Sequence, residues 1–122
     1  MTLQVRNMSV FYGDSQALWD VGIEVATGDL VSLVGANGAG KTTLLKAIAG
    51  LVDASSGRIE LDGTDLRPMP AERRVRNGIV LVPEGRRLFA GLTVRENLAI
   101  GAYARTDRAA IPGDMERVLG YF

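Results

Sequence analysis

The sequence predicts an α/β fold that opens with an antiparallel β layer. Alternating polar and apolar residues near the N-terminus are typical of half-buried strands. A short apolar run, Leu30 to Val34, then leads directly into a glycine-rich loop, and an amphipathic helix follows from Lys41 to Ala49. A strand that feeds such a loop and helix is typical of the buried parallel strands of α/β proteins.

The composition excludes several classes of protein. The 122 residues include 14 Lys plus Arg and 14 Asp plus Glu, so the formal net charge is zero and nucleic acid is not an expected partner. There is no Cys and no His, which excludes disulfides, zinc–thiolate sites and most His-based catalysis. Because neither a signal peptide nor a long apolar segment is visible, we expect one cytoplasmic domain.

The first elements are predicted from apolar patterns and from the turns that end them. Two strands form the antiparallel layer, one over Leu3, Val5 and Val10 to Tyr12, the other over Val21 to Val25. Leu30 to Val34 predicts a buried strand. The helix from Lys41 to Ala49 ends at Gly50, because glycine readily adopts the left-handed conformation of a helix end. Its apolar face carries Leu44, Leu45 and Ile48.

Strands and helices continue to alternate in the next stretch. Arg58 to Leu61 predicts a strand, and Asp62-Gly63 after it is a hairpin-type turn signal. Ala71 to Asn77 predicts a short basic helix. Ile79 to Val82 predicts a second buried strand, which Pro83 ends because proline cannot donate a ladder hydrogen bond.

The C-terminal region is predicted to be helical on both sides of a linker. Thr93 and Glu96 are spaced as a capping box, which starts a helix that runs to about Tyr103. Arg105 to Gly113 is predicted to be a polar linker. A last helix follows, because apolar residues recur with helical spacing at Met115, Val118, Leu119 and Phe122.

The most informative segment is Gly35 to Thr42, a full match to the phosphate-binding pattern G-x-x-x-x-G-K-[ST]. Glycines let successive N–H groups turn inward around phosphate oxygens. Lys41 would hold the β- and γ-phosphates, Thr42 would offer its hydroxyl to Mg²⁺, and the helix N-terminus adds about half a positive charge. A chance glycine-rich turn is disfavoured because strand and helix flank the loop as this mechanism requires. The predicted binding residues are Gly35, Asn37, Gly38, Ala39, Gly40, Lys41 and Thr42 of this pattern, together with Thr43 directly after it.

Several segments resemble the ATP-binding subunits of ABC transporters in order and spacing. They are Gly35 to Leu45, Tyr12-Gly13 upstream, Ser56 to Ile59 with Asp62-Gly63 downstream, and Thr93 to Leu98. Val82 to Phe89 is most similar to one of the two ATP-binding subunits of branched-chain amino-acid importers. The resemblance covers essentially the whole chain. It implies a P-loop NTPase core behind the β layer, truncated, with residues 1–122 as the N-terminal part of one ATP-binding domain.

This resemblance implies the ligands, partners and function. ATP and Mg²⁺ would bind, and in the complete subunit ATP hydrolysis would power import of branched-chain amino acids or a similar small polar solute. The implied partners are transmembrane permease subunits and a second ATP-binding subunit, on the inner face of the cell membrane. Two alternatives remain open: a non-catalytic nucleotide-binding fragment, and a different P-loop enzyme such as a small-molecule kinase.

Two residues outside the loop have competing interpretations. Tyr12 lies where the family places an aromatic residue that stacks on adenine; the alternative is a core aromatic on a strand. Glu84 stands where most relatives carry a glutamine that approaches Mg²⁺ and the attacking water, which would make it a catalytic and metal-binding residue. The alternative is a solvated turn residue that pairs with Arg86 or Arg87. A solvated face is also expected of the arginines as a group, namely Arg73, Arg74, Arg76, Arg86 and Arg87.

Several motifs that relatives carry are absent from this sequence, which bears on hydrolysis and on folding. Relatives continue with a Ser-Gly-Gly signature, an acidic Walker B strand with a catalytic Glu, and a switch His, none of which occurs in these 122 residues. We therefore expect no steady-state hydrolysis by this chain alone. In the family, strands from the missing half separate Leu30 to Val34 from Ile79 to Val82, so we expect unpaired, aggregation-prone strand edges.

Overall fold

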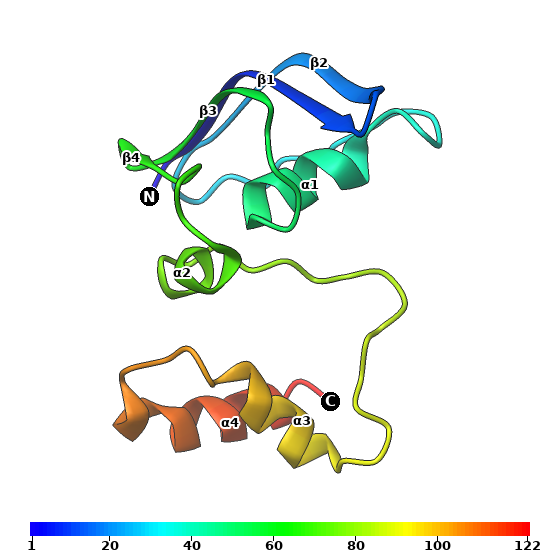
Figure 1. Ribbon diagram of the computed structural model, residues 1–122. Coiled ribbons are helices and arrows are strands. Elements are labelled where there is room, and N and C mark those ends of the chain that lie inside the picture. The colour runs from blue at the N-terminus through cyan, green and yellow to red at the C-terminus, as the bar shows by residue number, and fades with distance from the viewer. The chain divides into compact units, whose positions relative to one another are not determined.

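The computed structural model describes residues 1–122, which form two units, Met1–Leu81 and Val82–Phe122 (Figure 1). The first unit is built on a four-stranded antiparallel sheet in the order β2-β1-β3-β4. Its strands are β1 (Leu3–Tyr12), β2 (Ser15–Val25), β3 (Ser56–Leu61) and β4 (Thr64–Asp65). The predicted antiparallel layer is confirmed: β1 spans the predicted Leu3 to Tyr12, whereas β2 begins at Ser15, six residues before the predicted Val21.

The turns of this sheet follow the predicted chemistry. Asp62 and Gly63 both have positive φ, +49° and +77°, which is typical of the two-residue hairpin turn that their sequence predicts. The hairpin pairs Leu61 with Thr64, so the turn adds the short strand β4, which the sequence analysis missed.

A bulge in β1 sets which side chains enter the core. Strict alternation from Val5 would bury Asn7, but Asn7 has φ +50° and the register with β2 shifts between Val5 and Met8. Met8 is therefore fully buried, and Asn7 points outward and donates from Nδ2 to Oδ1 of Asp20 on β2 at 2.7 Å. The shift moves the apolar residues of the second half of β1 to the core face.

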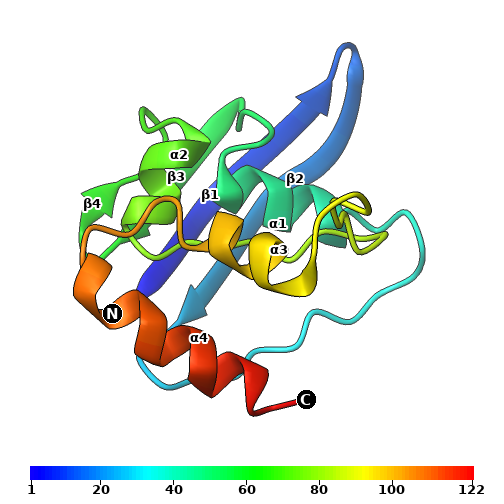
Figure 2. The same ribbon diagram turned by 90° about the horizontal axis from the view of Figure 1, so that it is seen from below.

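Helix α1 (Lys41–Ala49) lies along one face of this sheet (Figures 1 and 2). It begins and ends where predicted, and Gly50 has φ +79° at its C-terminal end. Leu45 is partly exposed, whereas the other two residues of the predicted apolar face are buried. The core between sheet and helix consists of Val5, Met8, Val10, Leu18, Leu44, Ala47, Ile48, Ile59, Leu61 and Leu66.

The prediction of buried strands at Leu30 to Val34 and at Ile79 to Val82 is wrong. Both segments lie outside the sheet, and Leu30 is 96% exposed and Val82 88% exposed. A buried parallel strand needs a neighbour on each side for its backbone hydrogen bonds, and no strand of this chain pairs with either segment. Parts of both segments instead line an apolar groove of about 270 Å³ beside α1, together with Leu3, Ile23 and Val25.

Helix α2 (Ala71–Arg76) confirms the predicted short basic helix, one residue shorter at its C-terminal end. The solvated face expected for its arginines holds for Arg73 and Arg76, which are exposed, but is wrong for Arg74. Arg74 is only 4% exposed, because its guanidinium donates to backbone carbonyl groups inside the first unit.

The second unit contains α3 (Val94–Gly101), the short 3₁₀ helix η1 (Arg108–Ala110) and α4 (Ile111–Leu119). The capping box is confirmed: the N–H of Glu96 donates to Oγ1 of Thr93 at 3.2 Å, and the N–H of Thr93 donates to Oε2 of Glu96 at 2.8 Å. Helix α3 ends two residues before the expected Tyr103. None of the helices in the structure has the length and apolar character needed to cross a membrane.

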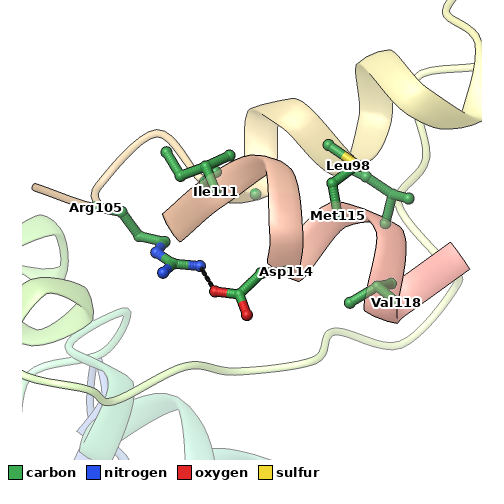
Figure 3. Close-up of a pocket in the computed structure, with 8 residues that line it drawn as sticks. Leu98, Arg105, Ile111, Asp114, Met115 and Val118 are labelled. Carbon is green, nitrogen blue, oxygen red and sulfur yellow. Dashed lines mark hydrogen bonds and ion pairs between the residues drawn. The ribbon is translucent and has the colours of Figure 1, made fainter. Parts of the chain in front are cut away.

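The predicted linker from Arg105 to Gly113 is wrong, because η1 and the first turn of α4 occupy most of it. Proline is tolerated in the first turn of a helix, where Pro112 lies. Arg105 donates from Nη1 to Oδ2 of Asp114 at 2.6 Å (Figure 3). It also donates from Nε to Oδ1 of Asp107 at 2.8 Å. These charged contacts order a stretch whose polar composition suggested a linker.

The predicted last helix is confirmed as α4, although it ends at Leu119, before Phe122. Met115 and Val118 of its apolar stripe line a small pocket of about 150 Å³ with Leu98 of α3 (Figure 3). Phe122 is exposed and lies beyond the helix, so the stripe is shorter than the sequence indicated.

Candidate functional site

The phosphate-binding pattern forms a loop that ends at the N-terminus of α1. Gly38 and Gly40 have φ +84° and +90°, the left-handed conformations expected of this loop. The carbonyl of Gly40 accepts the first helical hydrogen bond, from the N–H of Leu44 at 2.9 Å. Because Gly40 has no side chain, nothing at this position caps the helix, and the positive end of the helix dipole faces the loop.

Gly40 has a second role that the sequence pattern did not reveal. A Cβ at this position would lie 2.4 Å from Cδ2 of Leu18 and 2.9 Å from the carbonyl oxygen of Ala17, both on β2. At Gly38, by contrast, a Cβ would meet nothing within 4 Å. At Gly38, glycine is therefore needed only for the positive φ. At Gly40, it also allows the start of α1 to approach the sheet.

Lys41 closes the loop electrostatically. Its Nζ donates to the carbonyl oxygens of Gly35 at 2.7 Å and of Ala36 at 2.6 Å. The N–H of Ala39 also donates to the carbonyl of Ala36 at 3.2 Å, so the loop turns back on itself. The ammonium and the helix N-terminus thus concentrate positive charge at one end of α1, which suits a phosphate group.

Tyr12 lies beside the first turn of α1. Its hydroxyl is 3.4 Å from Oγ1 of Thr43, a long hydrogen bond that joins the end of β1 to the helix. The side chain is 48% exposed and does not belong to the buried core. The structure therefore brings Tyr12 and Thr43 together next to the loop, and the stacking of Tyr12 on adenine stays a prediction.

The two predicted metal-binding residues lie in different units. Thr42 is exposed on the first turn of α1. Glu84 is exposed in a turn of the second unit, where Gly85, Arg86 and Arg87 all have positive φ. The first-unit donor set fits Mg²⁺ held by one hydroxyl together with phosphate oxygens, because Mg²⁺ keeps several waters and few protein ligands. The catalytic and metal-binding roles of Glu84 stay predictions.

Comparisons with known proteins agree on one family. Residues 18–120 match the family model described as ABC transporter. The high-affinity branched-chain amino acid transport ATP-binding protein BraG of Pseudomonas aeruginosa is 46% identical over 120 residues, which cover 98% of this chain and 51% of that protein. The sulfate/thiosulfate import ATP-binding protein CysA of Bacillus cereus is 40% identical over 105 residues, which cover 86% of this chain and 29% of that protein.

A solved structure of the ATP-binding subunit of an ABC transporter superposes with a TM-score of 0.76 at 36% identity, covering 88% of this chain and 44% of the other. The chain spans about half the length of BraG, 51%. The fold is accordingly that of the α/β ATP-binding domain with its N-terminal β layer, in part. The loop geometry, the family match and this superposition together show that the chain belongs to the ABC transporter family, among its ATP-binding proteins.

Proposed function

We propose that the chain binds MgATP through the loop Gly35 to Thr42 and the N-terminal turn of α1. The observation that supports this most directly is the position of Lys41, whose ammonium spans the loop at the positive end of the helix. A bound phosphate would exchange the contacts of Lys41 with two neutral carbonyl groups for contacts with a charged partner, which form stronger hydrogen bonds.

Each residue of the site has a distinct role in this proposal. The backbone of the glycine-rich loop surrounds the β-phosphate, and Lys41 neutralises charge on the β- and γ-phosphates. The hydroxyl of Thr42 would hold Mg²⁺, which would supply charge neutralisation. Tyr12 covers the adenine ring, and Thr43 holds the Tyr12 hydroxyl near the loop. The remaining loop positions are Gly35, Asn37, Gly38, Ala39 and Gly40.

Hydrolysis and transport belong to the complete subunit in this proposal. Residues 1–122 act as the N-terminal part of one ATP-binding domain, which works with a second ATP-binding subunit and with permease subunits on the inner face of the membrane. In the complete subunit, the carboxylate of Glu84 would help to hold Mg²⁺ and would act on the attacking water. Purified chain that turned over MgATP at about 1 to 1,000 per second, the ordinary range of enzymes, would contradict the expectation that it does not hydrolyse ATP alone.

The transported solute is proposed to be a branched-chain amino acid. Support comes from BraG, whose name states this transport and which is 46% identical over nearly the whole chain. CysA, named for sulfate and thiosulfate, is 40% identical over a shorter stretch. Transport assays of the complete transporter with leucine and with sulfate as competing solutes would separate the two; sulfate uptake without leucine uptake would overturn the amino-acid proposal.

Nucleotide binding is tested with the only two lysines of the chain, both on α1. We expect Lys41→Ala to abolish MgATP binding measured by titration calorimetry, because the phosphates lose their charged donor. Lys46→Ala removes the same charge from the last turn of the helix and should bind as the unchanged chain does. Equal affinity of the two variants would overturn the assignment of the loop.

The adenine role is tested in the same titration. Loss of a base-stacking ring costs about 1 to 3 kcal/mol in nucleic-acid binders, which is roughly 5- to 100-fold in affinity. We expect a loss in this range for Tyr12→Ala and little loss for Tyr12→Phe. Phe11→Ala, at the neighbouring exposed aromatic residue, is the matched control. If Tyr12→Ala lowers only the melting temperature of the nucleotide-free protein, the core-packing interpretation is correct.

A further inference from the structure

Arg74 on α2 makes an unusual set of contacts for a charged side chain. It is 4% exposed, and its guanidinium donates to carbonyl oxygens of the backbone alone. The acceptors are the carbonyl oxygens of Met69 at 2.9 Å from Nε, Ala47 at 2.7 Å and Ile48 at 2.9 Å from Nη1, and Arg67 at 3.4 Å from Nη2.

Two of these acceptors belong to the last turn of α1. Ala47 and Ile48 lie at the negative end of the helix dipole, where no further helical turn supplies N–H donors. The carbonyl of Ala47 also accepts from the N–H of Gly50 at 3.2 Å. A guanidinium stays charged in proteins, and burial of a charge requires compensation by nearby dipoles or charges. Burial lowers the pKa of Arg74, while the charges of Asp53 and Asp65 oppose that shift. The carbonyl groups at the end of α1 thus take the place of the water that would otherwise solvate the guanidinium of Arg74.

The chain leaves room for this contact at Gly50. A Cβ at that position would lie 2.8 Å from Nε of Arg74 and 3.1 Å from both Cδ and Cζ. The residue that ends α1 is therefore also the residue that lets the guanidinium reach the helix.

Helix α1 is consequently held at both of its ends. At the N-terminus, Gly40 approaches β2 so closely that no Cβ fits. At the C-terminus, Arg74 ties Ala47 and Ile48 to α2 and to the segment before it. A nine-residue helix is a rigid rod of about 13 Å, so a shift at one end moves the other.

We propose that Arg74 is a positioning residue for nucleotide binding: by holding the C-terminal turn of α1, it fixes the placement of the phosphate loop at the other end of the helix. This inference rests on the proposed function of the loop. Arg74 itself touches no part of the loop in the structure, and its effect is transmitted through α1.

The test compares Arg74→Met and Arg74→Lys with Arg76→Met, which removes an exposed arginine from the same helix. Three quantities are measured for each: the melting temperature without nucleotide, the MgATP affinity well below that temperature, and the amide NMR signals of Gly35, Gly38 and Gly40. We expect Arg74→Met to shift the three loop signals and to weaken affinity about 10-fold or more, since small displacements of positioned groups have large effects. Arg74→Lys, with one point charge, should have an intermediate effect on the loop signals and on the affinity. Arg76→Met should change neither the loop signals nor the affinity.

A purely structural role gives a different result. Arg74→Met would then lower the melting temperature but leave the loop signals and the affinity of the folded protein unchanged, which would overturn the proposal. The loop signals are read without nucleotide. If the unchanged chain fails to bind MgATP while Arg74→Met still shifts those signals, the proposed function fails and the positioning role survives.

A second pair of variants decides the matter if Arg74→Met does not fold. Gly50→Ala places a Cβ against the guanidinium, whereas Gly63→Ala introduces a Cβ at a similar φ of +77° with no atom within 4 Å. Both variants place a Cβ at a positive φ, and only Gly50→Ala also brings it against the guanidinium of Arg74. We expect shifted loop signals and weaker MgATP binding for Gly50→Ala alone. Equal signals and affinities in the two variants would overturn the proposal.

Discussion

Different interactions stabilise the interior of each of the two units of this chain. The first unit has a core in which Met8, Val10 and Leu66 are completely inaccessible to solvent, and a buried arginine caps its central helix. In the second unit no residue of α3, η1 or α4 is buried. A capping box and the ion pairs of Arg105 organise those helices instead. Burial of apolar surface contributes more free energy than exposed ion pairs, so the first unit should account for most of the stability.

Truncation of a core residue should produce the largest difference between the units. Ile59→Ala removes a side chain that is 1% exposed, and we expect a loss of about 2 to 5 kcal/mol in the free energy of unfolding. Ile100→Ala, at a residue of α3 that is 45% exposed, should change it by only about 0.5 kcal/mol. Urea titration followed by circular dichroism and by the fluorescence of Trp19, the single tryptophan, measures both. Similar losses would show that the second unit has a core of its own.

The glycines of the loop allow a sharper comparison within the first unit. Gly38→Ala places an L-residue at φ +84°, which costs about 1 to 2 kcal/mol. Gly40→Ala carries the same strain and also forces a Cβ against Leu18 and Ala17, which adds about 1 to 3 kcal/mol of overpacking. Thermal unfolding without nucleotide separates the two effects. Equal losses would mean that α1 can move away from β2 without cost, and the second role of Gly40 would be wrong.

Loss of the capping box should have a smaller effect, confined to the second unit. Thr93→Ala removes the acceptor for the N–H of Glu96, and we expect a loss of about 1 kcal/mol. Thr93→Ser keeps the hydroxyl and should restore most of it. Amide hydrogen exchange in α3 measures the change locally. Exchange that accelerates equally in β1 would show that the units unfold together.

The smallest expected effect also comes from this capping box: the stability of α3 should depend on pH. The backbone N–H of Thr93, and then its hydroxyl, lower the pKa of Glu96 below its ordinary value of 4.5. A depressed pKa means that the carboxylate stabilises the folded state above the unfolded pKa, and this stabilisation is lost as the pH falls through the folded value. We therefore expect faster amide exchange in α3, relative to β1, as the pH falls below about 4.5, and Glu96→Gln should remove this dependence.

Several features could be predicted because their causes lie within a few residues of one another. The capping box depends on Thr93 and Glu96, and the end of α1 depends on Gly50. The turn at Asp62-Gly63 depends on residues that tolerate positive φ. The phosphate loop is also local, because its pattern of glycines and Lys41 determines both backbone shape and charge. These side chains act on their own backbone, so the order of residues was sufficient.

Other features depend on residues that are distant in the sequence. At the bulge, Asn7 donates to Asp20 on the neighbouring strand, and at Gly40 a Cβ would clash with Leu18. The sequence analysis expected a solvated face for Arg74, and it is buried because its guanidinium donates to carbonyl groups at the end of α1, which are distant from it in the sequence.

The apolar runs at Leu30 to Val34 and Ile79 to Val82 show the same division most clearly. Their composition establishes that they are apolar and suited to burial, and the sequence predicted strands for that reason. A strand, however, exists only when a neighbour supplies its hydrogen bonds, and this chain places none beside either run. Composition and local pattern therefore establish the loop, the turns and the helix ends, whereas strand pairing, burial of charge and close backbone approach depend on partners that folding brings together.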